Sequence, residues 1–260
     1  MSEELKYTNK LKGARVLIIG GTSGLGFAAA QAVIEQNISE LIISSSSATR
    51  IEATIAKLRT LYPTSSTNII GYPCNLGDEA SLPANVENLF SQVGTLDHII
   101  FTAGDAPLLQ PFLENSFETI KAAGTIRFFA PLLVAQYGYK HLKPGPASSI
   151  TLTSGASAEK PIPGWTVTCS YLSGLQGMMR GLALDLKPVR VNLVSPGGVD
   201  TEMWDVLQGE RAGVVAELAR QTTTGRVGQA EDVAEAYIYC LRDWNLSGSI
   251  ISSNAGRMLV

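Results

Sequence analysis

An apolar run that ends in closely spaced glycines constrains this chain more than any other feature. Residues 16–26 read Val-Leu-Ile-Ile-Gly-Gly-Thr-Ser-Gly-Leu-Gly. The apolar residues predict a buried strand, and Gly20, Gly21, Gly24 and Gly26 predict a tight turn that opens a helix. Such a turn allows close approach to the backbone and presents N–H groups to a pyrophosphate. We therefore predict a dinucleotide site here, and a purely structural turn is the alternative.

Runs with strand character alternate along the whole chain with segments of helical spacing. The expected strands are Arg15–Ile19, Glu40–Ser44, Asn68–Tyr72, His98–Thr102, Ser148–Thr153, Arg190–Val194 and Gly248–Ser252. The expected helices are Gly24–Gln36, Ala48–Leu61, Ser81–Gln92, Phe117–Lys140, Thr168–Leu186 and Glu231–Leu241. This alternation predicts the α/β class, with a Rossmann-type doubly wound parallel sheet. No linker divides residues 1–260, so we expect a single domain.

Composition narrows the partners of the chain. The 260 residues carry a formal net charge of −3 and no Lys/Arg run, which argues against nucleic acid and anionic membranes as partners. A small-molecule substrate is therefore expected. Cys74, Cys169 and Cys240 lack disulfide and zinc-ligand spacing, so we expect no metal. The N-terminal residues lack the apolar core of a signal peptide, and a cytoplasmic location is expected.

The segment from about 201 to 225 has two interpretations. Its apolar residues are spaced as one or two short helices, which in a fold of this kind would form a lid over the site. Ordinary core packing is the alternative. The residues concerned are Met203, Trp204, Val206, Leu207, Val214, Val215 and Leu218.

Hydroxyl groups follow the second expected strand, where an NAD enzyme would carry an acidic residue. This chain has Ser44, Ser45 and Ser46, and then Arg50. A carboxylate about 4 Å from a 2′-phosphate would cost on the order of 4 kcal/mol per charge pair, whereas hydroxyls and a guanidinium attract the phosphate. NADP(H) is therefore favoured over NAD. The serines would alternatively cap the next helix, and the two roles are compatible.

Four motifs, the glycine turn among them, resemble the short-chain dehydrogenase/reductase family over nearly the whole chain. Gly20–Gly26 is similar to its cofactor loop, and Thr102–Gly104 to its Asn-Ala-Gly strand end. Residues 195–201 resemble its nicotinamide-side loop, and 225–234 its C-terminal signature. Together with the serines and Arg50, the resemblance implies cofactor contacts from Gly20, Thr22, Ser23, Leu25, Gly26, Asn75, Leu76, Ala103, Gly104, Tyr171, Pro196, Gly197, Val199 and Thr201.

The catalytic positions depart from the pattern that this resemblance implies. The family uses Asn, Ser, Tyr and Lys, with Tyr as the proton donor. Here Ser154 remains, while the Tyr position falls on Val167, the Lys position on Tyr171 and the Asn position on Gly124. Val167 cannot titrate, so ordinary ketone reduction is not expected. The reduction of an iminium needs no proton donor. We therefore expect a substrate with a C=N⁺ bond.

A narrower resemblance is to fungal reductases of prenylated-indole alkaloid pathways, the malbrancheamide and paraherquamide type. It rests on Arg127, on Pro163-Gly164-Trp165 and on the stretch 167–186. It implies NADPH-dependent reduction of an iminium-like intermediate and guidance of an intramolecular Diels-Alder reaction. Those enzymes are expected to carry an acidic residue shortly before the Trp, where this chain has Ile162.

We predict catalytic or substrate-orienting roles for Arg127, Ser154 and Trp165, each with a structural alternative. Arg127 sits in an apolar helix and needs either a ligand or an ordinary salt-bridge partner. Trp165 would stack on a planar or cationic substrate, or simply pack in its loop. Tyr171 would reach the ribose hydroxyls, or pack against a helix. Asp105 is a candidate replacement acid, although a turn role explains it equally.

Two functions stay open at this point. One is an NADPH-dependent oxidoreductase, and the other is a non-redox NADP-binding isomerase, cyclase or sensor on the same fold. The family's helix interfaces also imply a homodimer or homotetramer, formed here by residues 128–134 and 168–186.

Overall fold

A seven-stranded parallel sheet forms the centre of the computed structural model, which describes residues 7–108, 110–204 and 211–260. The strand order is β3-β2-β1-β4-β5-β6-β9. The strands are β1 (Arg15–Ile19), β2 (Glu40–Ser45), β3 (Asn68–Pro73), β4 (His98–Phe101), β5 (Ser149–Thr153), β6 (Arg190–Pro196) and β9 (Ile250–Ser253). The expected Rossmann-type fold is therefore confirmed.

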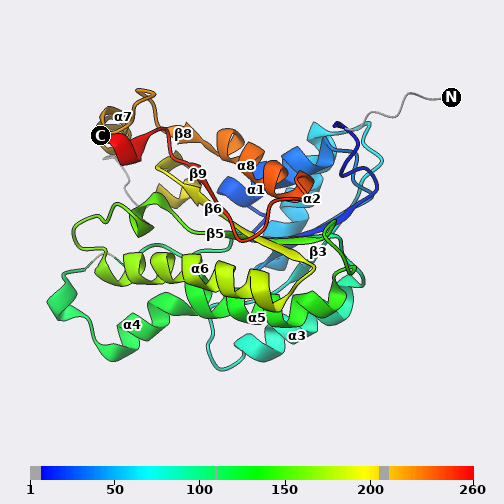
Figure 1. Ribbon diagram of the computed structural model, residues 1–260, viewed down its shortest axis with the longest axis horizontal. Helices are drawn as coiled ribbons and strands as arrows, with labels where there is room; N and C mark the ends of the chain where they lie inside the picture. Colours follow the sequence, from blue (N-terminus) through cyan, green and yellow to red (C-terminus); the bar gives the residue numbers. More distant parts are fainter. Residues whose placement is uncertain (1–6, 109, 205–210) are drawn as a thin grey trace.

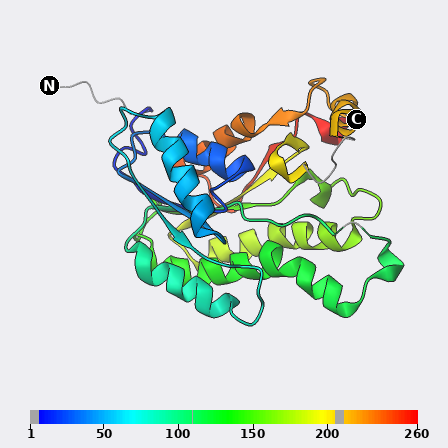
Figure 2. The ribbon, with the colours of Figure 1, turned by 180° about the vertical axis from the view of Figure 1, so that it is seen from behind.

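Helices cover both faces of the sheet (Figures 1 and 2). One face carries α1 (Gly24–Ile34), α2 (Ala48–Leu61) and α8 (Ala230–Arg242). The other carries α3 (Leu82–Val93), α5 (Ala130–Gly138) and α6 (Thr166–Asp185), and α4 (Phe117–Gly124) packs on α6. Beyond these, α7 (Arg211–Arg220) lies beside a two-stranded pair formed by β7 (Val199–Asp200) and β8 (Gly228–Gln229).

The alternating side chains of each strand supply two separate hydrophobic cores. On β1, Leu17 and Ile19 join the core beneath α3, α5 and α6, whereas Val16 and Ile18 join the core beneath α1 and α8. A parallel sheet covered on both faces requires strands that are apolar on both sides. This requirement explains why the strands read as continuous apolar runs.

The expected helix over 117–140 is present, but it is not a regular α-helix throughout. After α4 the chain makes a π turn at Thr125–Phe129 and then continues as α5, which ends in a 3₁₀ turn at Tyr139–His141. Pro131 lies at the start of α5, where its missing N–H is tolerated but would interrupt a longer α-helix. The π turn carries Arg127, so this local change of helix geometry bears directly on the site.

Smaller differences concern the ends of elements and the last strand. The helix expected at 168–186 begins two residues earlier, at Thr166, and the last strand begins at Ile250. None of the described helices has the length and apolar character needed to cross a membrane.

Candidate functional site

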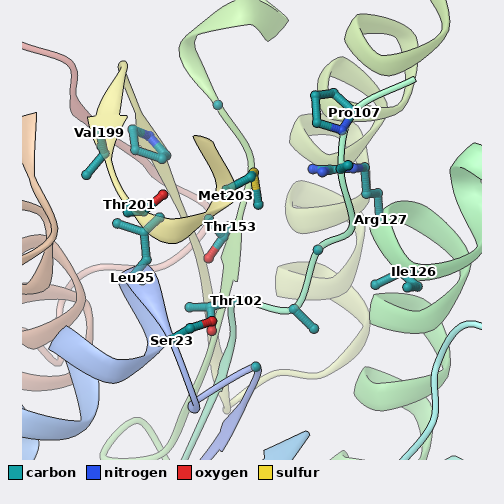
Figure 3. Close-up of a pocket in the computed structure, with 18 of the residues that line it drawn as sticks. Ser23, Leu25, Thr102, Pro107, Ile126, Arg127, Thr153, Val199, Thr201 and Met203 are labelled. Carbon is teal, nitrogen blue, oxygen red and sulfur yellow. The ribbon is translucent and has the colours of Figure 1, made fainter. Parts of the chain in front are cut away.

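One cavity of about 750 Å³ lies at the carboxyl ends of the parallel strands. Ligands of open α/β sheets bind at this edge. Figure 3 shows Ile126 and Arg127 on one wall, facing Ser23, Leu25 and Thr201 across the opening. The expected residues that line it are Gly20, Thr22, Ser23, Leu25, Gly26, Ser45, Ser46, Arg50, Asn75, Leu76, Ala103, Gly104, Arg127, Ser154, Trp165, Pro196, Gly197, Val199 and Thr201. Ser44 and Tyr171 do not belong to this lining.

The glycine turn forms a cradle in which a side chain would not fit. Gly20 has a φ of +93°, and a Cβ there would lie 2.5 Å from the backbone nitrogen of Ala103. A Cβ at Gly26 would lie 2.2 Å from the carbonyl oxygen of Gly20. The turn and the start of α1 are thus packed as closely as the dinucleotide fingerprint requires.

The N-terminus of α1 faces the cavity and already attracts an anionic group. Ser23 occupies the N-cap position but makes no side-chain cap hydrogen bond. The backbone N–H of Gly24 instead donates to Oε2 of Glu202 at 2.9 Å, and Glu202 also lines the cavity. A carboxylate on this N–H has the charge and geometry that a phosphate would have. The residues present therefore fit a pyrophosphate.

The serine run divides between two roles. Ser45 and Ser46 line the cavity, and Nη2 of Arg50 donates to Oγ of Ser46 at 2.8 Å. Ser47 caps α2 by accepting the N–H of Arg50. Ser44 corrects our prediction, because it is fully buried in β2 and its hydroxyl lies inside the fold.

Tyr171 also corrects our prediction of a cofactor contact. Its hydroxyl donates to the carbonyl oxygen of Ile120 at 3.0 Å, and its ring packs against Phe128. A Cβ added to Gly124 would lie 2.5 Å from Cζ of Tyr171. The aromatic ring thus fills the space that Gly124 leaves open. Tyr171 therefore packs against a helix, which was the alternative interpretation.

Arg127 projects from the π turn into the cavity and pairs with Asp105. Its Nε lies 2.9 Å from Oδ1 of Asp105, and Nη2 also donates to the Asp105 carbonyl. The Arg127 side chain is only 15% exposed. Burial lowers the pKa of its guanidinium, and the neighbouring Asp105 carboxylate opposes that shift. Arg127 therefore keeps its charge in the cavity wall.

Ser154 and Trp165 line the cavity close to the start of α6. The Ser154 hydroxyl donates to the carbonyl oxygen of Leu172 at 2.9 Å, so it can offer a ligand only its lone pairs. Val167 is buried outside the lining, while its neighbour Thr168 belongs to it. No Tyr, Lys or His belongs to the described lining of this cavity.

Part of the segment that we interpreted as a lid lines the cavity. Met203, Trp204, Val214 and Leu218 line the cavity, whereas Val206 and Leu207 lie outside the described residues. An ion pair at 2.8 Å between Arg211 and Asp200 connects α7 to β7.

Our sequence reasoning missed several residues of the lining, among them Thr168, Glu202 and Arg257. Glu202 follows the motif residue Thr201, which was the available signal for it. Arg257 carries no motif that would have revealed it. Among the described residues, no group of three His, Cys, Asp or Glu side chains is arranged to hold a metal ion.

A model of the SDR-like Rossmann domain matches residues 7–260. The chain therefore belongs to the short-chain dehydrogenase/reductase family. It is 45% identical over 259 residues to the short-chain dehydrogenase/reductase fsr5 of Gibberella fujikuroi, and the match covers 98% of each chain. It is 41% identical to malC of Malbranchea aurantiaca, over the full length of both. The solved structure of that organism's MalC reductase/Diels-Alderase superposes with a TM-score of 0.92, covering 98% of this chain and 100% of the other at 39% identity.

Proposed function

We propose that this protein is an NADPH-dependent reductase that acts on an iminium-like carbon of a planar small molecule in specialised alkaloid metabolism. The observation that carries the proposal is the contrast within one cavity. The glycine turn leaves a cradle that fits a dinucleotide, whereas the described lining of the cavity holds no Tyr, Lys or His that could donate a proton. The similarity to a reductase/Diels-Alderase supports the same chemistry and a second role in guiding a Diels-Alder cyclisation.

An iminium suits this wall because its reduction needs hydride alone. The bound NADPH would supply the hydride to carbon, and the C=N π electrons would move to nitrogen, leaving a neutral amine without a proton transfer. Trp165 would stack on the planar or cationic part of the substrate. Arg127, held by Asp105, would fix the orientation of the substrate beside the nicotinamide.

The preference for NADPH rests on Ser46 and Arg50. Their hydroxyl and guanidinium groups lie in the cavity lining, where they would bind a 2′-phosphate. We expect NADPH to bind at least about tenfold more tightly than NADH, which corresponds to about 1.4 kcal/mol. Titration calorimetry measures both affinities, and equal values would contradict the proposed 2′-phosphate site.

The chemistry is tested with 4-deuterated NADPH and an N-alkyl dihydroisoquinolinium as a model cyclic iminium. We expect deuterium in the amine product, poor turnover of simple ketones, and little gain from Val167→Tyr combined with Tyr171→Lys. Arg127→Ala and Trp165→Ala should each lower turnover by up to about 10²-fold, because misplacement of about 1 Å has that effect. The exposed Arg59 on α2, changed to Gln, is the control. Rapid ketone reduction, or full activity of both alanine variants, would contradict the proposed site.

The alternative is a non-redox NADP-binding isomerase, cyclase or sensor. Val167 favours it, because valine cannot act as the proton donor at this position. The same deuterium experiment separates the two functions, since tight binding of NADPH without incorporation of label into the iminium probe supports the alternative. We also propose a homodimer or homotetramer that involves residues 128–134 and α6, where Phe129 and Leu132 are partly exposed. A monomeric mass in light scattering at micromolar concentration would count against self-association.

A further inference from the structure

Arg257 is a buried cation that the protein leaves without a partner. It begins the 3₁₀ turn Arg257–Leu259, it is 9% exposed, and it lines the cavity. Within residues 7–108, 110–204 and 211–260, no hydrogen bond or ion pair engages its guanidinium. Its nitrogens are not among the sealed side-chain atoms that lack a partner, so they remain accessible from the cavity. Arginine side chains with so little exposure are normally paired in proteins. The cation therefore calls for a partner from outside the chain.

The charged groups of the cavity wall leave no carboxylate available for Arg257. The other charged residues of the described lining are Arg50, Arg127 and Glu202. The carboxylate of Glu202 lies at the N-terminus of α1, on the N–H of Gly24. The nearby carboxylate of Asp105 is paired with Arg127.

A second cation lies beside Arg257. Nζ of Lys160 donates to the backbone carbonyl of Arg257 at 3.0 Å. No ion pair joins Lys160 to a carboxylate in the part of the chain that the structure describes. Lys160 does not line the cavity, but it adds a second positive charge close to Arg257, and a ligand with an anionic group would offset that charge.

The contacts of the C-terminal turn place Arg257 near the substrate end of the cavity. The N–H of Arg257 donates to the carbonyl of Asn254 at 3.0 Å, and the backbone of Asn254 closes on Gly197 in the nicotinamide-side loop. Lys160 lies two residues after the 3₁₀ turn Ala156–Ala158, and this turn begins two residues after Ser154. Arg50, at the expected 2′-phosphate end, belongs to a different part of the sheet edge.

We propose that the guanidinium of Arg257 binds an anionic oxygen of the substrate, of the carboxylate or enolate type. The guanidinium presents paired N–H donors that match two oxygen lone pairs or a carboxylate. An anionic oxygen here would also offset the repulsion that the unpaired cation imposes on a cationic substrate. The inference deepens the proposed function and rests on it only in taking this cavity as the substrate site.

Two indole probes that differ in charge test this subsite on the full chain saturated with NADPH. We expect indole-3-propionate to bind about tenfold more tightly than indole-3-propionamide in calorimetry. Arg257→Gln should reduce this preference to less than about threefold, and Arg257→Lys should retain most of it. Arg59→Gln, an exposed residue of α2 outside the cavity lining, should leave the preference unchanged.

Several results would overturn the inference. They are equal affinities of the two probes for the parent protein, no saturable binding of either probe, or an unchanged preference in Arg257→Gln. A loss of NADPH affinity in Arg257→Gln would assign the residue to a nucleotide phosphate and also overturn it. If Arg257→Gln does not fold, the parent protein and Arg257→Lys decide the question. The probe titrations measure binding alone, so they test the Arg257 subsite. The deuterium label tests hydride transfer, so the two proposals can fail independently.

Discussion

The contact between Glu202 and the N-terminus of α1 makes a prediction about nucleotide affinity. A pyrophosphate that binds the N–H of Gly24 must first displace the Glu202 carboxylate, which accepts that N–H at 2.9 Å. Glu202→Gln keeps a side-chain oxygen of the same reach and removes the negative charge. We therefore expect Glu202→Gln to bind NADPH more tightly than the parent protein.

The size of the effect follows from two contributions. A hydrogen bond to a charged group contributes about 1.5–3 kcal/mol and a neutral one about 0.5–1.5 kcal/mol, so the competing contact weakens by about 1 kcal/mol. A displaced carboxylate about 6 Å from a phosphate charge adds about 0.7 kcal/mol of repulsion in water. Glu202 is exposed, so salt screens both contributions. We expect about threefold to tenfold tighter binding at about 0.1 M salt.

Calorimetric titration with NADPH measures this difference. Adenosine 2′-monophosphate, which lacks the pyrophosphate, should bind the parent protein and Glu202→Gln equally. Glu217→Gln on α7 removes an exposed charge of the same type and should change neither affinity. The reasoning is refuted if Glu202→Gln binds NADPH no more tightly, or if it binds the monophosphate with the same gain.

Two further predictions concern stability. Gly124→Ala should lower the free energy of unfolding by about 1–3 kcal/mol, because its Cβ would overlap the ring of Tyr171. Tyr171→Leu should reduce that penalty in a double-mutant cycle measured by urea unfolding, and a purely additive cycle would argue against the overlap. Burial holds the pKa of His98 at about 3, below its ordinary 6.5, so the unfolded chain binds a proton that the folded chain does not. Stability should therefore fall as pH drops from about 6.5 towards 3, with His98 contributing about 1.4 kcal/mol per pH unit. His98→Asn should remove that part of the slope, and an identical slope in both proteins would refute it.

The parts of the fold that could be predicted are those with a local physical cause. Apolar runs specify the strands. Close packing at Gly20 and Gly26 leaves no room for a side chain, which is why the glycines alone predicted the cofactor turn. The strand alternation of β2 would also have distinguished Ser44 from Ser45, since neighbouring side chains point to opposite faces. We treated the serines as a group and so assigned the buried one wrongly.

The remaining parts of the site depend on contacts between distant segments. Tyr171 turns away from the cavity because Gly124, nearly fifty residues earlier, leaves room for its ring. Arg257 reaches the cavity only because the C-terminal turn folds back beside Gly197. Neither relation leaves a periodic signal in the sequence, so pattern analysis had no means of detecting it.

The π turn at Thr125–Phe129 makes the direction of Arg127 depend on the number of residues in this helix. A π turn contains one residue more than an α turn, and each residue of an α-helix advances by about 100° around the axis. Deleting a residue of the turn that does not line the cavity would turn α4 relative to α5 by about 100° around the axis, while Pro131 would still leave one backbone hydrogen bond of the helix unmade. The guanidinium would then rotate away from Asp105, so an insertion or deletion here would remodel the site more than many substitutions would.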